Sequence, residues 1–280
     1  MQNHENIYLS VKDYLVSGES FDLVYDDDLD FLKTFPQPEV NELPRYYESQ
    51  DYISHTDEKR GLFSSAYQFI KKWSLQKKAN LILEMNKGLG SLLDVGAGTG
   101  DFLKVAKDKG WDVYGMEPNK NASSLASEKG IQLKFSLNEF EGKQFDIVTL
   151  WHVLEHIPNL EETILQLSSL VKTNGTLIVA VPNFKSYDAN HYGKFWAAFD
   201  VPRHLWHFSK KSIENLFSEH FKLQETKPMI FDSFYVSLLS EKYKTGNKFS
   251  LKGIWTGLVS NLKAKNTKEY SSHIYCFKKI

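Results

Sequence analysis

Apolar residues in the middle of the chain alternate between two spacings. Short, continuous apolar runs, which are typical of buried strands, occur at residues 91–95, 112–117, 131–135, 145–151 and 176–182. Helical spacing separates these runs at residues 101–109, 121–129 and 160–172. Strands that alternate with helices indicate a parallel sheet with helices on both faces. We therefore expect an α/β domain built around such a sheet.

The flanking segments are less regular. A helix is expected from residue 62 to near Gly88 and Gly90, and Ser209 is the expected N-cap of a helix at residues 210–220. Alternating strands are predicted at residues 221–229 and 273–279, with amphipathic pieces between them at 231–243 and 251–263. We assign residues 61–280 to one domain, with lid insertions at about 183–208 and 230–268. Residues 1–60 are predicted to be an irregular N-terminal extension that caps a substrate.

Composition narrows the classes of partner. The chain of 280 residues is 41% hydrophobic and 25% charged, as in ordinary globular proteins, and its 34 basic and 35 acidic residues almost cancel. We therefore expect no nucleic-acid partner. No apolar run is long enough to span a bilayer, and no signal-peptide pattern occurs in the first residues. The single cysteine, Cys276, excludes an internal disulfide and a cysteine-based zinc site, which fits a cytoplasmic protein.

Three glycines mark a candidate ligand loop. Gly96, Gly98 and Gly100 follow an apolar strand directly and precede a helix directly. Glycine lets the chain turn sharply there and lets a ligand touch the backbone. The spacing is one residue tighter than the dinucleotide fingerprint, which would need a glycine where this chain has Asp101.

Acidic residues near the loop indicate the charge of its ligand. Asp94 and Asp101 flank the glycines and would repel a pyrophosphate but attract a cation. Glu117 ends the next strand, where a carboxylate can accept hydrogen bonds from both ribose hydroxyls, and Pro118 breaks that strand. A cationic nucleoside without phosphate fits these features. S-adenosylmethionine is such a molecule.

At this point the sequence resembles the class I S-adenosylmethionine-dependent methyltransferases. Residues 145–158, FDIVTLWHVLEHIP, resemble the fourth strand and following turn of the branch that includes ubiquinone-biosynthesis methyltransferases. Residues 201–209, VPRHLWHFS, resemble a segment after the fifth strand in related proteins. The resemblance implies a Rossmann-like seven-stranded sheet of order 3-2-1-4-5-7-6 with the last strand antiparallel.

The resemblance also implies a set of cofactor-binding residues. The loop residues Gly96, Ala97, Gly98 and Gly100 would line the cofactor, with Asp94 beneath its amino-acid end. Glu117, followed by Pro118, would hold the ribose, Leu137 would lie near the adenine, and Trp151 and His152 would lie beside the methionine portion. Many relatives carry paired N-terminal cysteines that resemble a zinc knuckle, and this chain has none there. We therefore expect no metal.

Histidines supply the candidates for catalysis and acceptor binding. His152 and His156 follow the fourth predicted strand, at the edge where open α/β sheets bind ligands, and His152 is the first candidate for a general base. An aromatic and basic cluster in the predicted lid could close over an acceptor: His191, Tyr192, Arg203, His204 and His207. Local packing explains the same cluster equally well.

Two function classes follow from these features. The leading hypothesis is an enzyme that transfers a methyl group from S-adenosylmethionine to a small-molecule acceptor by in-line displacement. The alternative is a regulatory protein that binds the cofactor without turnover. The position of Asp101 disfavours a nicotinamide-dependent dehydrogenase.

Overall fold

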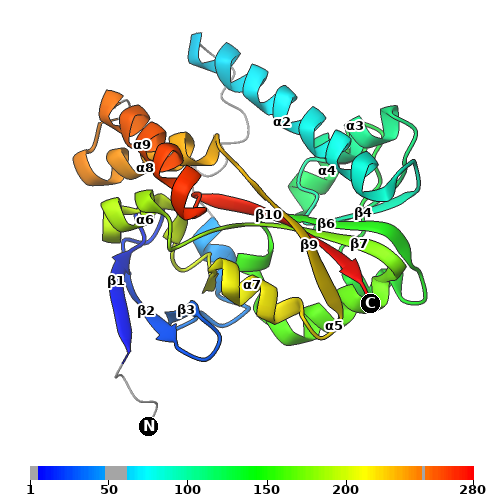
Figure 1. Ribbon diagram of the computed structural model, residues 1–280, viewed down its shortest axis with the longest axis horizontal. Helices are drawn as coiled ribbons and strands as arrows, with labels where there is room; N and C mark the ends of the chain where they lie inside the picture. Colours follow the sequence, from blue (N-terminus) through cyan, green and yellow to red (C-terminus); the bar gives the residue numbers. More distant parts are fainter. Residues whose placement is uncertain (1–5, 48–61, 248–249) are drawn as a thin grey trace.

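The computed structural model describes residues 6–47, 62–247 and 250–280, with the side chains of residues 62–67 excepted. The part of the predicted N-terminal extension at residues 48–60 lies outside this description. The described chain contains a six-stranded sheet and a separate four-stranded sheet. Figure 1 shows the larger sheet across the centre, with helices above and below it.

The larger sheet has the order β5-β4-β6-β7-β10-β9. Its strands are β5 (Asp112–Met116), β4 (Ser91–Val95), β6 (Phe145–Trp151), β7 (Val171–Pro182), β10 (Ser272–Lys279) and β9 (Phe221–Pro228). The first four are parallel, whereas β10 is antiparallel to both β7 and β9. The predicted antiparallel last strand is confirmed.

The strand predicted at residues 131–135, the third of the seven in chain order, does not form. It is reduced to an isolated parallel bridge between Lys134 and Met116. The N–H of Lys134 donates to Gly115, and the N–H of Glu117 donates to Lys134. Pro118 then ends the partner strand, so the edge is too short for a longer ladder.

Helices cover both faces of this sheet, as predicted. One face packs against α2 (Leu62–Asn86), α3 (Asp101–Asp108) and α4 (Lys120–Glu128). The other packs against α5 (Leu160–Leu170) and α7 (Lys210–Phe217). Ser209 caps α7 as expected, since its hydroxyl accepts the N–H of Ser212 and the Ser212 hydroxyl accepts the N–H of Ser209.

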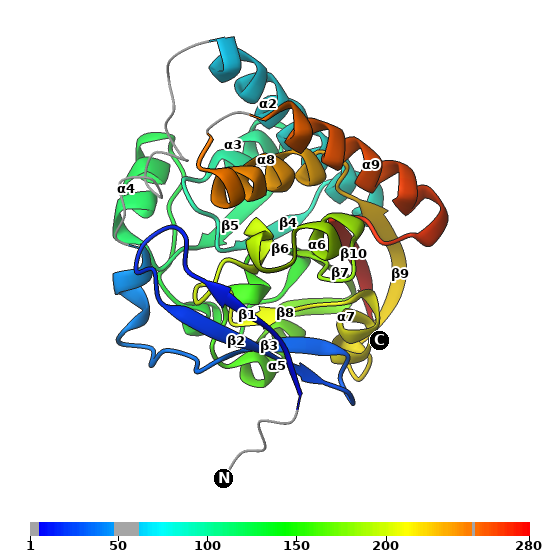
Figure 2. The same ribbon diagram turned by 90° about the vertical axis from the view of Figure 1, so that its left-hand side faces the viewer.

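The prediction of an irregular N-terminal extension was wrong. The antiparallel strands β1 (Ile7–Lys12), β2 (Ser20–Asp26) and β3 (Phe31–Phe35) form a sheet, which the short β8 (Trp206–His207) completes. Leu23 and Leu32 point into a second apolar core and are fully buried. Alternation over such short strands was too brief to outweigh the surrounding polar residues. Figure 2 shows this sheet beside the larger one.

The two predicted insertions are also regular structure. Residues 183–208 contain α6 (Tyr187–Tyr192), the 3₁₀ turns η4 (Gly193–Phe195) and η5 (Ala197–Phe199), and β8. Trp196 and Phe199 are buried in the second core, so this segment packs as part of the fold. The second insertion is a pair of helices, α8 (Asp232–Thr245) and α9 (Leu251–Thr267). The domain boundaries and the lid function stay predictions.

Candidate functional site

The glycine loop lies at the carboxyl end of β4, between β5 and β6. Its three glycines have positive φ angles of 70°, 54° and 73° at Gly96, Gly98 and Gly100. A Cβ at Gly96 would lie 2.5 Å from a methyl of Val153, so close packing requires glycine there. A Cβ at Gly98 would meet no described atom within 4 Å. Gly98 therefore borders open space that a ligand could fill.

Glu117 lies against this loop. One of its carboxylate oxygens accepts the N–H of Gly98 at 2.8 Å and the other accepts the N–H of Asn119 at 2.9 Å. Pro118, between Glu117 and Asn119, is exposed, and Asn119 caps α4. The structure thus brings the predicted ribose-binding carboxylate to the predicted ligand loop.

Asp94 is buried beneath the same loop. The hydroxyl of Thr149 on β6 donates to its carboxylate at 2.6 Å. Burial raises the pKa of Asp94 to about 7, although the Thr149 hydrogen bond and the charge of Lys78 oppose that shift. A cation placed beside this carboxyl would favour its ionised form.

Lys78, on α2, carries a positive charge that acts on Asp94, and it was not predicted from the sequence. Its ammonium lies 4.3 Å from the ring centroid of Trp151. Burial lowers the pKa of Lys78, while the charges of Asp94 and Asp232 counteract that effect. A lysine beside the buried helix positions Ala79 and Ile82 was the one available signal.

Trp151 packs in the same core cluster as Ala97 of the loop, whereas Leu137 belongs to the core cluster on the other face of the sheet. Trp151 packs edge-on against Phe102 at a centroid distance of 5.6 Å, and its indole N–H is buried with no hydrogen-bond partner among the described residues. Leu137 is buried at the start of η2 (Leu137–Phe140). Open space at Gly98, an unpaired indole N–H and two carboxylates fit a cationic nucleoside.

His152 follows β6 and lies between two carboxylates. Its backbone has a positive φ of 56°, held by donation of its N–H to Ala180 at 2.9 Å. Its ring nitrogens lie 3.4 Å from Glu155 and 3.1 Å from Asp232 at the start of α8. Although burial alone would lower it, these acids raise the pKa of His152 to about 10. The ring is therefore a cation at neutral pH and cannot accept a proton while both acids flank it.

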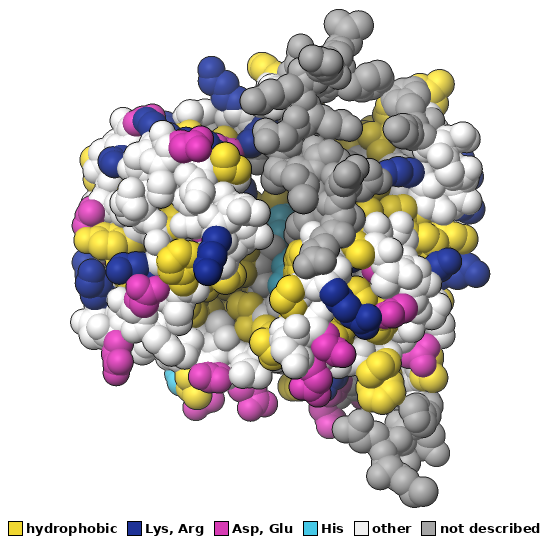
Figure 3. Space-filling view, turned by 180° about the vertical axis from the view of Figure 1, so that it is seen from behind, with side chains coloured by type: hydrophobic (Ala, Val, Ile, Leu, Met, Phe, Trp, Pro, Cys, Tyr) yellow, Lys and Arg dark blue, Asp and Glu magenta, His cyan; other side chains and the backbone are white. Residues whose placement is uncertain are grey.

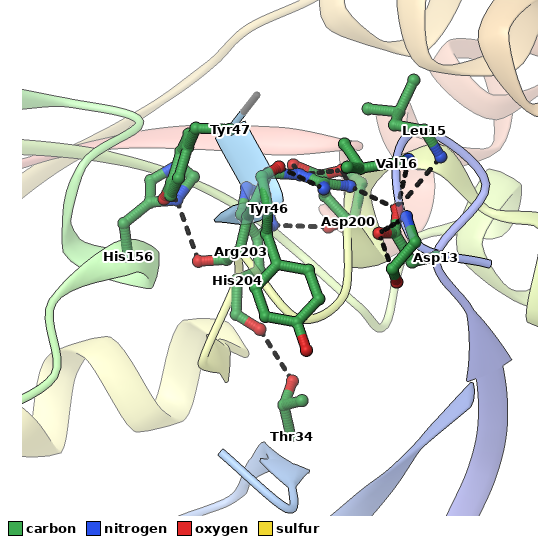
Figure 4. Close-up of polar contacts among 12 residues, drawn as sticks. Asp13, Leu15, Val16, Thr34, Tyr46, Tyr47, His156, Asp200, Arg203 and His204 are labelled. Atoms are coloured by element: carbon green, nitrogen blue, oxygen red, sulfur yellow. Dashed lines mark hydrogen bonds and ion pairs between the residues drawn. The ribbon is translucent and has the colours of Figure 1, made fainter. Parts of the chain in front are cut away.

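His156, in the 3₁₀ turn η3 (Leu154–His156), has the opposite electrostatic environment. Burial and the nearby His204 lower its pKa to about 4, so it is neutral. Its Nδ1 lies 3.0 Å from the carbonyl of Arg203 and 3.1 Å from the hydroxyl of Tyr47 (Figure 4). Because Nδ1 faces a carbonyl, it carries the proton. Figure 3 shows histidine side chains at the bottom of a hollow lined by apolar groups.

Arg203 joins the N-terminal sheet to this region. Its guanidinium donates to Asp13 at 2.9 Å, to Asp200 at 2.7 Å and to the Tyr46 carbonyl at 2.8 Å (Figure 4). These acids raise the already high pKa of the buried Arg203, and the arginine in turn lowers the pKa of Asp13 and Asp200 against the effect of burial. Arg203 was predicted to bind the methyl acceptor, and in the structure its guanidinium donates these hydrogen bonds within the protein.

The other residues predicted to bind the methyl acceptor fall into two groups. His204 donates towards the carbonyl of Ala198 and contacts the His156 ring, and His207 lies 3.0 Å from the Thr34 hydroxyl. His191 and Tyr192 instead lie on α6, towards α8 and α9, where His191 is exposed. The structure does not gather all five around one cavity, and their role in acceptor binding stays a prediction.

One group among the described residues has the geometry of a metal site. The ligand atoms of Glu155, His156 and His204 lie within 4.8 Å of one another. The Glu155 carboxylate is buried and has no hydrogen-bond partner within the described chain, although His152 supplies a charge 3.4 Å away. The expected absence of a metal therefore stays a prediction.

Sequence comparisons agree with this geometry. Residues 66–222 match the family model described as a methyltransferase domain. A ubiquinone biosynthesis O-methyltransferase of Azoarcus sp. is 32% identical over 108 residues, which cover 34% of this chain and 46% of the relative. The same enzyme of Rickettsia canadensis is 26% identical over 156 residues, covering 50% and 66%. This chain thus spans only about half to two thirds of these relatives.

Solved structures share the fold. Magnesium protoporphyrin IX methyltransferase of Synechocystis PCC 6803, with bound S-adenosylhomocysteine, has a TM-score of 0.56 and 16% identity, over 84% of this chain and 97% of that one. A cyclopropane synthase of Mycobacterium tuberculosis has a TM-score of 0.52 and 14% identity, over 88% and 99%. Since the family model covers more than half of the 280 residues, the chain belongs to the methyltransferase domain family.

Proposed function

We propose that the open space beside Gly98 and Glu117 binds S-adenosylmethionine and that the chain transfers its methyl group to a small-molecule acceptor by in-line displacement. The observation that carries this proposal is the hydrogen bond from the Gly98 N–H to Glu117, next to open space. It joins the end of β5 to the loop after β4, so a ribose and the rest of a nucleoside can be held together. The cofactor supplies an electrophilic methyl group.

The amino-acid end of the cofactor has a complementary pair of groups. Asp94 would pair with its ammonium, and Lys78 would pair with its carboxylate. Asp94 is buried and Lys78 is half-buried, and each shifts the other's pKa towards the charged form. Charge-assisted hydrogen bonds are strongest in such surroundings, so this pair would contribute much of the affinity.

Positioning is the proposed source of rate enhancement. Holding two reactants in line can lower a barrier by roughly 7–11 kcal/mol without any proton transfer. His152 is cationic between Asp232 and Glu155, and it would act by holding these two carboxylates in place. As a base it would first have to lose these acidic partners. The neutral His156 has too low a pKa, about 4, to be a strong base.

Calorimetric titration tests the cofactor site. Wild-type protein is expected to bind S-adenosylmethionine and S-adenosylhomocysteine, and Lys78→Met is expected to weaken both by about tenfold or more, since a charge-assisted bond is worth roughly 1.5–3 kcal/mol. Lys72→Met removes an exposed lysine of the same helix and serves as the control. Equal losses in the two variants would exclude the role of Lys78, and no binding to wild type would overturn the proposal.

A further inference from the structure

The α8–α9 pair packs with its small residues inward and its large apolar residues outward. The buried face of α9 consists of Gly253, Thr256, Gly257, Ser260 and Ala264. A Cβ at Gly257 would lie 2.8 Å from the Cα of Phe234, so the two helices are in close backbone contact. The side chains that would normally fill a core are therefore left on the opposite face.

That opposite face is an apolar stripe along α9. Its members are Leu251, Ile254, Trp255, Leu258 and Leu262, which are all exposed, Leu251 by 74% and Trp255 by 65%. Their spacing follows the helical period, so they lie along one side of the helix. In Figures 1 and 2 this helix pair lies at the outside of the molecule, away from α5.

The charge around this stripe is strongly positive. Residues 232–268 contain seven lysines and two acids: Lys242, Lys244, Lys248, Lys252, Lys263, Lys265 and Lys268 against Asp232 and Glu241. Asp232 pairs with His152, and the buried Glu241 offsets Lys252 at 3.7 Å, so the segment keeps a surplus of lysines. The whole chain has a net charge of only −1, so this positive charge is local.

We propose that the α9 stripe binds the surface of an anionic lipid bilayer. An exposed apolar stripe with a tryptophan, bordered by lysines, is the chemistry of a helix that lies in the headgroup region. Among the described residues no helix is long and apolar enough to cross a bilayer. A two-fold contact with a second copy would instead bring the lysines of both stripes together and cost electrostatic energy.

The helix pair that carries the stripe contacts the candidate active site through the start of α8. Phe231 immediately precedes α8 and packs against Trp73 of α2 at 5.1 Å, while the next residue, Asp232, contacts His152. An acceptor dissolved in the bilayer would thus approach the methyl-transfer site from this side. That approach rests on the proposed function, whereas bilayer binding does not.

Vesicle co-sedimentation tests the binding without any need for turnover. Wild-type protein should partition onto vesicles that contain phosphatidylglycerol and much less onto pure phosphatidylcholine, and added salt should release it. The double variant Trp255→Ser with Leu258→Ser should bind vesicles at least about tenfold more weakly, because two apolar side chains no longer insert into the bilayer. Leu165→Ser, at an equally exposed leucine of α5, should bind like wild type.

A second variant tests the charged part separately. The triple change Lys252→Gln, Lys263→Gln and Lys265→Gln should weaken binding to anionic vesicles by about tenfold or more and reduce its salt dependence. Circular dichroism melting checks that each variant remains folded. Absence of vesicle binding, or equal binding by wild type and the double variant, would overturn the proposal. So would a wild-type dimer in sedimentation velocity that the double variant converts to monomer.

Discussion

The charge on His152 is the feature of the site most open to direct measurement. Asp232 provides the largest contribution that raises the His152 pKa, through a contact of 3.1 Å. Asp232→Asn keeps the shape of the side chain and removes its charge. An opposite charge at this range shifts a pKa by about 1–3 pH units. We therefore expect the His152 pKa to fall from about 10 to roughly 7–9.

The same group contributes to stability with a defined sign. A histidine whose pKa is raised on folding stabilises the fold fully below its unfolded pKa of 6.5, and that contribution is lost as pH rises to about 10. The full shift corresponds to about 5 kcal/mol. The side chain of His152 is 34% exposed, so solvent screening reduces this to roughly 1–2 kcal/mol. Wild type should lose that amount between pH 6.5 and 10.

Two measurements check this reasoning. NMR titration of the His152 ring proton gives its pKa directly, and urea unfolding at several pH values gives the stability difference. Asp232→Asn should lose its histidine-linked stability at lower pH than wild type. Asp108→Asn, which removes an exposed partner of Lys104 on α3, is the matched control and should leave both curves unchanged. An ordinary pKa for His152 in wild type would refute the reasoning.

Three further predictions concern the loop, the arginine and metal content. Gly98→Ala and Gly142→Ala both place a side chain at positive φ with open space and should each cost about 1 kcal/mol in unfolding free energy. In calorimetry, the Gly98 variant alone should lose cofactor affinity, and equal affinities would show that no ligand lies there. Arg203→Ala should destabilise the protein by about 3–5 kcal/mol in denaturant titrations because buried acids lose their partner. The exposed Arg45→Ala should cost less than about 1 kcal/mol, and similar losses would contradict a buried linkage. Since His152 already balances the charge of Glu155, mass spectrometry of purified protein should find no stoichiometric metal, and one ion per chain would contradict this.

Strands surrounded by helices were predictable because their burial makes them continuously apolar. β4 and β6 begin and end as the apolar runs indicated. The strand predicted at residues 131–135 did not form because the length of an edge strand depends on its neighbour, and β5 ends at Met116, before Pro118. The place of β8 in the N-terminal sheet could not be predicted, because it pairs with β3 from more than 170 residues away and no local pattern records that pairing.

The candidate site shows the same division between local and distant information. The loop glycines and Glu117 follow consecutive strands, so general rules for open sheets placed them together. Lys78 and Asp232 come from α2 and α8, and their proximity to the strand ends depends on how those helices pack. Arg203 was predicted to bind the methyl acceptor, and its buried partner Asp13 was not predicted because it lies 190 residues away.

The two hydrogen bonds of Glu117 have a consequence for the energetics of ligand binding. Gly98 and Asn119 already donate hydrogen bonds to the Glu117 carboxylate. The loop and the start of α4 are therefore held together before any nucleoside binds. The conformational entropy of ordering this segment is therefore lost during folding rather than at the moment of association. The ribose of the proposed cofactor would therefore meet a segment that is already ordered, so more of the free energy of its contacts would appear as affinity.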